Sequence, residues 1–204
     1  MIVSVCPTFL CNNFCYFCYL GKLKTNKQIL KLCALDKMLA ELSSVYQIDG
    51  FNVFGGEVTL LENSYIVELI AILRKYCHDI TITSNLAYMG KLEFLGTQFS
   101  TSYNAERQDF MKISGLMQNK PKCTFNLSTV ILKSIIDKQP KEFFDNVPTN
   151  CKSITFQKYS PSVYNDVNIN ITESEYEDTL IKYIEYFLEN KHKYDFSITN
   201  IYNI

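Results

Sequence analysis

The fold is decided by the segment Cys11-Asn12-Asn13-Phe14-Cys15-Tyr16-Phe17-Cys18-Tyr19, which follows the short apolar run Ile2–Cys6. Its three cysteines are separated by spacings of four and then three residues. Thiolates so spaced can converge on one four-iron cluster and leave the fourth iron open to another ligand. A structural zinc site would need a fourth Cys or His, and the two histidines, His78 and His192, lie far along the chain. The segment therefore predicts a metal centre rather than disulfides, with an open iron–sulfur cluster favoured over zinc.

Length and composition place the chain among ordinary globular proteins. Its 204 residues suit a single domain over 1–204, and 47% of them are hydrophobic. Twenty Lys and Arg residues against 21 Asp and Glu residues give a net charge of −1, which argues against a general polyanion binder, so nucleic acid is not indicated. No apolar run is long enough for a membrane span, and no basic leader precedes Cys6. We therefore expect no membrane partner and a cytoplasmic location.

Short apolar runs alternate with longer amphipathic ones along the chain. The runs that predict strands are rich in Ile, Val, Phe and Thr, and they lie at Ile2–Cys6, Gly50–Phe54, Asp79–Ser84, Gln98–Ser102, Thr124–Leu132 and Ser153–Lys158. Helical spacing predicts helices over Leu35–Leu42 and Ser64–Lys75, and a capping box opens a last helix over Thr172–Asn190. Repeated βα units imply parallel strands with outer helices. A full eight-unit barrel takes about 250 residues, so we predict an α/β fold, a partial (βα)6 TIM-like barrel.

A second motif, Gly55-Gly56-Glu57, comes directly after the predicted strand Gly50–Phe54. Glycines let backbone groups approach a ligand closely, and a carboxylate can accept hydrogen bonds from an ammonium group. At the C-terminal end of a barrel strand such residues face the catalytic side. Taken alone, the motif is also typical of a plain turn between a strand and a helix.

Together the two motifs resemble the signature of the radical S-adenosylmethionine (radical SAM) superfamily, which has C-x3-C-x2-C after the first strand of a partial barrel. The resemblance implies a [4Fe–4S] cluster held by Cys11, Cys15 and Cys18, with S-adenosylmethionine (SAM) chelating the open iron. It also implies that Phe17 lies near the adenine of SAM.

The resemblance extends to residues at the ends of later strands. It implies that Gly55, Gly56 and Glu57 hold the methionyl amine of SAM, with Val58 where the family usually has proline. It implies that Ser84 faces SAM, and that Ser102 and Asn104 match the family's Ser-x-Asp element. Asn104 replaces the acid, which keeps hydrogen bonding and loses the charge. Further candidates to face the cofactor are Asn126, Gln157 and Tyr159.

The implied activity is reductive cleavage of SAM to a 5′-deoxyadenosyl radical, which abstracts hydrogen from a substrate. A flavodoxin or ferredoxin is the expected reductase, and the substrate class stays open between a peptide, a nucleobase and another small molecule. The sequence assigns no residue to the chemistry on the substrate. Two alternatives remain, an activase of a glycyl-radical enzyme and a non-catalytic iron–sulfur or zinc module.

The other cysteines and the basic residues near the motif are less specific. No cysteine follows Cys151, so we expect no auxiliary cluster within this sequence. The basic run made by Lys22, Lys24, Lys27 and Lys31 is a candidate docking face for an acidic reductase or a nucleic acid, or simply a solvated face.

Overall fold

The computed structural model describes residues 1–88, 90, 96–104, 110–120, 123–165 and 169–203. These residues divide into two compact units, a first unit of Met1–Asn13 and Lys22–Ser100 and a second unit of Phe14–Gly21 and Thr101–Ile204. The cysteine segment therefore begins in the first unit and continues in the second. The single domain inferred from the chain length stays a prediction.

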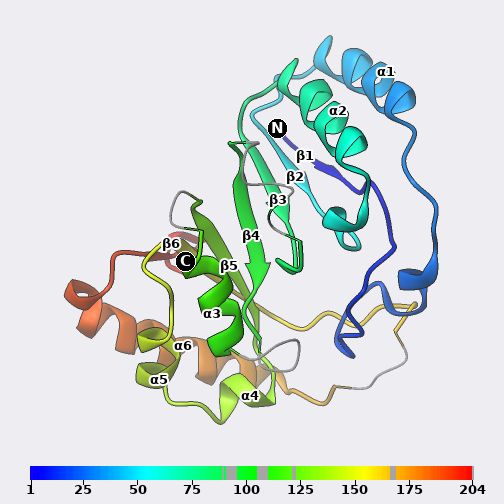
Figure 1. Ribbon diagram of the computed structural model, residues 1–204. Helices are drawn as coiled ribbons and strands as arrows, with labels where there is room; N and C mark the ends of the chain where they lie inside the picture. Colours follow the sequence, from blue (N-terminus) through cyan, green and yellow to red (C-terminus); the bar gives the residue numbers. More distant parts are fainter. Residues whose placement is uncertain (89, 91–95, 105–109, 121–122, 166–168, 204) are drawn as a thin grey trace. The chain divides into compact units, whose positions relative to one another are not determined.

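The sheet of the first unit is parallel and its strands are β1 (Ile2–Val5), β2 (Gly50–Val53), β3 (Ile80–Thr83) and β4 (Gln98–Ser102), of which Thr101 and Ser102 belong to the second unit (Figure 1). One row across these strands pairs Val5 with Val53, Val53 with Ile82 and Ile82 with Phe99. All four side chains in this row are buried. Buried parallel strands favour such β-branched and aromatic residues, and their C-terminal ends share one edge.

Two amphipathic helices accompany this sheet, α1 (Leu32–Ser43) and α2 (Asn63–Arg74), and they pack against each other (Figure 1). Their buried faces repeat at helical spacing, with Leu35 and Leu39 on α1 and Leu69 and Leu73 on α2. Both helices contain the stretches that periodicity predicts, to within one residue at the C-terminal end of α2.

Within the second unit, the end of β4 is followed by β5 (Phe125–Val130), β6 (Cys151–Gln157) and β7 (Ser197–Ile198). The Tyr103 N–H donates to the Ser128 carbonyl at 2.9 Å, and β5, β6 and β7 pair in parallel. The strand order is therefore β1-β2-β3-β4-β5-β6-β7. The predicted parallel α/β organisation is confirmed, although β6 begins two residues before its predicted start. The sequence did not predict β7, because a strand of two residues has no recognisable pattern.

The helices of the second unit are α3 (Phe110–Gln118), α4 (Lys133–Ile136), α5 (Pro140–Asp145) and α6 (Glu173–Asn190). The predicted capping box opens α6: the Thr172 hydroxyl accepts from the Glu175 N–H at 3.2 Å, and the Glu175 carboxylate accepts from the Thr172 N–H at 2.8 Å. These bonds satisfy N–H groups at the start of the helix, where no preceding turn supplies carbonyl acceptors. The helix therefore begins where the sequence predicts.

Aromatic rings form the core between α5, α6 and β6. The Tyr183 ring contacts Phe143 at 5.4 Å and Phe156 at 5.2 Å between centroids, in edge-to-face geometry. All three rings are buried. Large rings in such contacts supply most of the apolar area that stabilises a core of this size.

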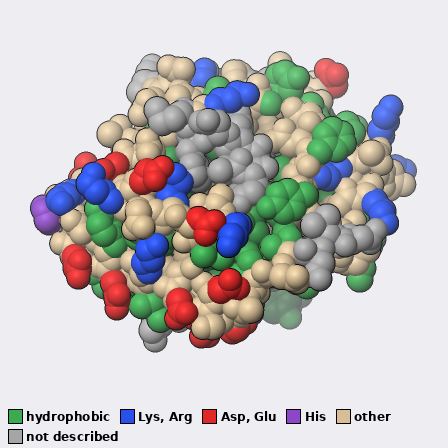
Figure 2. Space-filling model, turned by 90° about the horizontal axis from the view of Figure 1, so that it is seen from below, with side chains coloured by type: hydrophobic (Ala, Val, Ile, Leu, Met, Phe, Trp, Pro, Cys, Tyr) green, Lys and Arg blue, Asp and Glu red, His purple; other side chains and the backbone are tan. Residues whose placement is uncertain are grey.

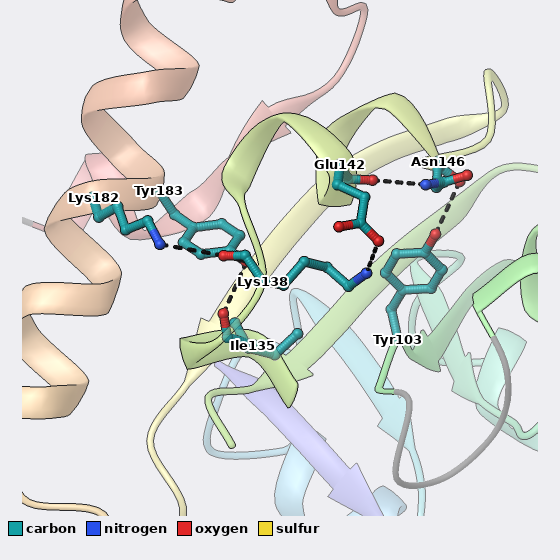
Figure 3. A network of polar contacts seen from close by, with 7 residues as sticks. All are labelled: Tyr103, Ile135, Lys138, Glu142, Asn146, Lys182 and Tyr183. Carbon is teal, nitrogen blue, oxygen red and sulfur yellow. Dashed lines mark hydrogen bonds and ion pairs between the residues drawn. The ribbon is translucent and has the colours of Figure 1, made fainter. Parts of the chain in front are cut away.

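A polar network joins α6 to the ends of α4 and α5 (Figure 3). The Tyr183 hydroxyl donates to the Ile135 carbonyl at 3.0 Å and to the Lys138 carbonyl at 3.3 Å. The Lys182 ammonium also donates to the Lys138 carbonyl, at 3.2 Å, and the Lys138 ammonium pairs with Glu142. Burial raises the pKa of Tyr183 far above its ordinary value, so the hydroxyl keeps its proton and remains a donor.

The surface mixes both signs of charge. Among the residues coloured in Figure 2, Lys and Arg side chains lie among Asp and Glu side chains, with hydrophobic side chains exposed between them. This agrees with the net charge of −1. None of the helices in the described part of the chain is both long enough and apolar enough to cross a membrane.

Replacing the Tyr183 hydroxyl tests the network around α6. Tyr183→Phe should lower the free energy of unfolding by about 1–2 kcal/mol, because it keeps the ring and removes the hydroxyl that donates to the Ile135 and Lys138 carbonyls. Urea unfolding followed by circular dichroism measures the change. The matched control is Tyr46→Phe, at a side chain that is 57% exposed, where we expect a change within about 0.5 kcal/mol. Equal values for the two variants would contradict a stabilising role for the Tyr183 hydroxyl.

Candidate functional site

The candidate site of the first unit lies in the loops that follow β1, β2 and β3. The Gly56 N–H donates to the Thr8 carbonyl and the Glu57 N–H donates to the Leu10 carbonyl, both at 2.8 Å. These two bonds tie the glycine turn after β2 to the chain that leads into Cys11. Because parallel strands end at one edge, the glycine motif and the start of the cysteine motif lie at the C-terminal end of this sheet.

The two glycines are required by the close approach of the chain itself. Gly55 has a φ of +133°, and a Cβ there would lie 2.5 Å from the Cys6 sulfur. A Cβ on Gly56 would lie 2.1 Å from the Leu10 carbonyl oxygen, closer than any real contact. The glycines therefore let the chain that leads into Cys11 pass directly over the turn. A direct contact between these glycines and SAM stays a prediction.

Glu57 is the most densely hydrogen-bonded side chain of this site. Its carboxylate is buried, with 1% of the residue exposed. Oε1 accepts from the Thr59 N–H at 3.0 Å, from the Thr59 hydroxyl at 2.6 Å and from the Ser84 hydroxyl at 2.8 Å. Oε2 accepts from the Asn85 N–H at 2.6 Å. Four donors from two loops thus hold the carboxylate in one orientation.

This carboxylate has no cationic partner in the part of the chain that the structure describes. In the ion pairs there, lysine ammonium groups or the amino terminus contact other acids, and none of these pairs includes Glu57. Oε2 accepts a single hydrogen bond, which leaves a lone pair for one more donor. A buried charge without a counter-ion is costly, so the site is chemically suited to a ligand with an ammonium group. The amino group of SAM fits this requirement.

A tight turn after β3 supplies two of the four donors. Leu86 adopts a φ of +64°, which is uncommon for a residue with a side chain, and its N–H donates to the Ser84 hydroxyl at 3.0 Å. The Ala87 N–H donates to Asn85 Oδ1 at 3.0 Å. Ser84, a predicted contact of SAM, therefore orients Glu57 in this structure, and its contact with SAM stays a prediction. The sequence indicated Ser84 but gave no sign that Thr59 and the Asn85 backbone share this carboxylate.

Cys11 lies in the first unit with its flanking asparagines. The Cys11 N–H donates to the Lys24 carbonyl at 3.1 Å, and the Asn13 N–H lies 3.4 Å from the Cys11 sulfur. The Asn12 side-chain oxygen accepts from Asn85 Nδ2 at 2.7 Å. The backbone around the first cysteine is therefore fixed by three separate contacts.

Cys15 and Cys18 lie in the second unit, where Asn165 secures the second half of the cysteine loop. The Cys18 N–H donates to the Cys15 carbonyl at 3.2 Å. Asn165 Nδ2 donates to the Tyr16 carbonyl at 2.5 Å and to the Cys18 carbonyl at 2.9 Å. No sequence pattern pointed to Asn165, because it lies 147 residues beyond Cys18.

Gly21, at the end of the cysteine loop, allows another close approach of the backbone, to Tyr164. It has a φ of +45°, and a Cβ there would lie 1.7 Å from the Tyr164 carbonyl oxygen. Phe17, the residue predicted to lie near adenine, is half-buried and packs edge-on against Tyr16. Its contact with adenine stays a prediction.

The metal site rests on its donor set. In the described part of the chain, no three His, Cys, Asp or Glu side chains are grouped as a preformed metal site. None of the three motif cysteines forms a disulfide, and all three are half-buried. Three thiols at this spacing match the ligands of an iron–sulfur cluster, so Cys11, Cys15 and Cys18 remain the predicted ligands.

Asn104 holds the end of β4 against β5. Its Nδ2 donates to the Val130 carbonyl at 2.7 Å, and its Oδ1 accepts from the Val130 N–H at 3.1 Å. Asn104 is fully buried, whereas Ser102 is half-buried. An aspartate could accept from the N–H but could not donate to the carbonyl. The exchange of acid for amide therefore has a local reason, and contacts of Ser102 and Asn104 with SAM stay predictions.

The remaining cysteines and the basic run differ in exposure. Cys123 and Cys151 are buried, and burial raises the pKa of the Cys151 thiol to about 12, so it stays protonated and is a poor metal ligand near neutral pH. Lys24, by contrast with Lys22 and Lys27, is buried. The basic run is therefore not a continuous exposed face, and docking of a reductase there stays a prediction.

Comparison with solved structures identifies the fold. The chain is similar to native anSMEcpe with bound AdoMet (TM-score 0.75, 16% identity), covering 98% of this chain and 64% of that chain. It is similar to SuiB of Streptococcus suis bound to the precursor peptide SuiA (TM-score 0.70, 15% identity), covering 97% and 48%. It is also similar to coproporphyrinogen III oxidase (HemN) from Escherichia coli, a radical SAM enzyme (TM-score 0.57, 17% identity), covering 92% and 52%. Neither a family model nor a curated protein sequence matches the chain.

These likenesses show that the chain has the radical SAM core fold, a partial TIM-like barrel of parallel strands with outer helices. The predicted fold class is confirmed. The chain spans only 48% to 64% of the length of these three proteins.

Gly56 provides a direct test of the packing between the glycine turn and the chain that leads into Cys11. Gly56→Ala should lower the free energy of unfolding by about 3 kcal/mol or more, because the new methyl group would meet the Leu10 backbone and not a flexible side chain. Urea unfolding of the cluster-free protein measures the loss. The control is Gly115→Ala within α3, where a Cβ meets nothing within 4 Å; it should leave stability unchanged or raise it by up to about 1 kcal/mol. A Gly56→Ala variant as stable as the control would refute the close approach.

Proposed function

We propose that this chain is a radical SAM enzyme that binds a [4Fe–4S] cluster through Cys11, Cys15 and Cys18 and binds SAM beside it. The observation that carries the proposal is the Glu57 carboxylate, buried at the turn that supports the cysteine loop and lacking a cation among the described residues. A free amino acid moiety such as that of SAM supplies the missing ammonium. The radical SAM core fold supports the same conclusion.

When bound, the cluster and SAM would supply the chemistry, which is reductive cleavage of SAM followed by hydrogen abstraction from the substrate. Glu57 would hold the ammonium through Oε2 while Thr59 and Ser84 keep Oε1 in place. The main contribution of the chain is to position these groups and to exclude water. Phe17, Ser102 and Asn104 are proposed to complete the SAM site.

A peptide is the substrate class that the comparisons favour. SuiB is described with its precursor peptide SuiA, and anSMEcpe with the Cp18Cys peptide and AdoMet. The two proteins cover 97% of this chain at TM-scores of 0.70 and 0.73. We therefore propose a peptide substrate and a flavodoxin or ferredoxin as electron donor. A nucleobase or small-molecule substrate, a glycyl-radical activase and a non-catalytic iron–sulfur or zinc module are the competing outcomes.

Anaerobic reconstitution tests the cluster and the reaction together. The protein should bind about four irons and four sulfides per chain, and with dithionite and SAM it should release 5′-deoxyadenosine slowly. Replacing Cys11, Cys15 or Cys18 with Ala should abolish both signals, because a cubane on two thiolates is not retained. Iron and sulfide analysis and chromatography of the nucleoside products measure them.

Cys77→Ala is the control for these variants, because Cys77 lies outside the motif and should leave iron content unchanged. Stoichiometric zinc without iron uptake would overturn the cluster. Iron uptake without 5′-deoxyadenosine would favour the non-catalytic module.

Glu57→Gln tests the ammonium site separately from the cluster. Removing the charge should weaken SAM binding about ten- to a hundredfold, the equivalent of a charge-assisted hydrogen bond of about 1.5–3 kcal/mol. Calorimetry of the cluster-loaded protein measures the affinity, and iron content should stay at the wild-type value. Glu62→Gln, at an exposed carboxylate before α2, is the matched control. Equal affinities for the two variants would remove Glu57 from the SAM site.

A further inference from the structure

The amide of Asn85 has only one orientation that satisfies its neighbours. Asn85 is buried, with 4% exposed, and its Oδ1 accepts from the Ala87 N–H at 3.0 Å. Nδ2 must therefore point the other way, where it donates to Asn12 Oδ1 at 2.7 Å. Rotating the amide by half a turn would place a donor against the Ala87 N–H and an oxygen against the Asn12 oxygen. The link from Asn85 to Asn12 is thus fixed by a third group.

Asn85 also contacts the carboxylate of the ammonium site, through a different atom. Its backbone N–H donates to Glu57 Oε2 at 2.6 Å. One buried residue therefore holds both Glu57 and the loop residue next to Cys11. The backbone contact does not depend on the side chain, so substitutions of Asn85 can break one link and preserve the other.

The hydrogen bond from Asn85 ends at Asn12, which lies between Cys11 and the residue that contacts the Cys11 sulfur. Asn12 is exposed, and its side chain is tied down through Asn85. The next residue, Asn13, directs its N–H at the Cys11 sulfur at 3.4 Å. A hydrogen bond to a ligand sulfur stabilises the more negative, reduced state of an iron–sulfur cluster and so raises its reduction potential.

We propose that Asn85 is a positioning residue that holds the Asn12–Asn13 backbone in place, so that the Asn13 N–H stays on the Cys11 sulfur and keeps the cluster potential high enough for reduction. This inference rests on the proposed function, in which Cys11 is a cluster ligand. It adds a role for Asn85 toward the cluster that is separate from the role of its backbone toward Glu57.

A double-mutant cycle on the reconstituted protein tests the link, with the reduction potential measured by redox titration followed by electron paramagnetic resonance. Asn85→Ala and Asn12→Ala should each shift the potential to more negative values by similar amounts. The double variant should shift it no further, because both changes break the same bond. Iron content should stay at the wild-type value in all three, and Asn63→Ala, at an exposed asparagine of α2, should leave the potential unchanged.

If Asn85→Ala fails to fold, Asn12→Ala at the exposed end of the same hydrogen bond still decides the question.

Additive shifts in the cycle, or no shift in Asn12→Ala, would each overturn the role of Asn85. The failure of the proposed function has a different appearance, because the wild-type protein itself would then take up no cluster or would release no 5′-deoxyadenosine from SAM. A wild-type cluster with a potential that ignores Asn12 and Asn85 would leave the proposed function intact and remove only this inference.

Discussion

The buried carboxylate of Glu57 is the interaction on which the site depends. Its four donors come from the turn after β2 and from the end of β3, so it can be satisfied only when these two strands are paired in register. The same residue donates its N–H to Leu10, in the chain that leads to Cys11. Desolvation of the charge is offset by these bonds, and the absence of a cation among the described residues leaves the remaining electrostatic demand to a ligand.

The glycine turn and residues 6–10, which lead into Cys11, are consequently one structural element. A motif of two glycines before an acid is commonly understood as room for a ligand, yet here the space next to each glycine is filled by the protein: by Cys6 and Thr8 at Gly55, and by Leu10 at Gly56. The segment that leads into Cys11 is therefore set in place by the protein's own backbone before any cofactor binds. Such preorganisation lowers the ordering cost of binding, because the chain is already held where the ligand requires it.

Features that depend on a few neighbouring residues could be predicted from the sequence. Features that depend on contacts between distant residues could not. Three cysteines at fixed spacing, two glycines before an acid and a capping box at Thr172 each act within a few residues, and all were recognised. Apolar runs placed the strands, because burial of parallel strands dictates their composition. The partners of Glu57 beyond β2 and the clamp by Asn165 depend on tertiary contacts between distant residues, and asparagine and serine carry no spacing signal that would reveal them.

Asn104 shows why a departure from a family pattern needs the structure for its interpretation. In the sequence, the amide of Asn104 stands where the family pattern has an acid, which keeps hydrogen bonding and loses the charge. In the structure both amide atoms are bound to Val130, one as donor and one as acceptor. An amide can satisfy an N–H and a carbonyl of the same residue at once, whereas an ionised acid can only accept, and the buried setting makes an unsatisfied carbonyl costly. The junction of β4 and β5 therefore selects asparagine for a reason independent of SAM, so this exchange does not argue against the proposed cofactor.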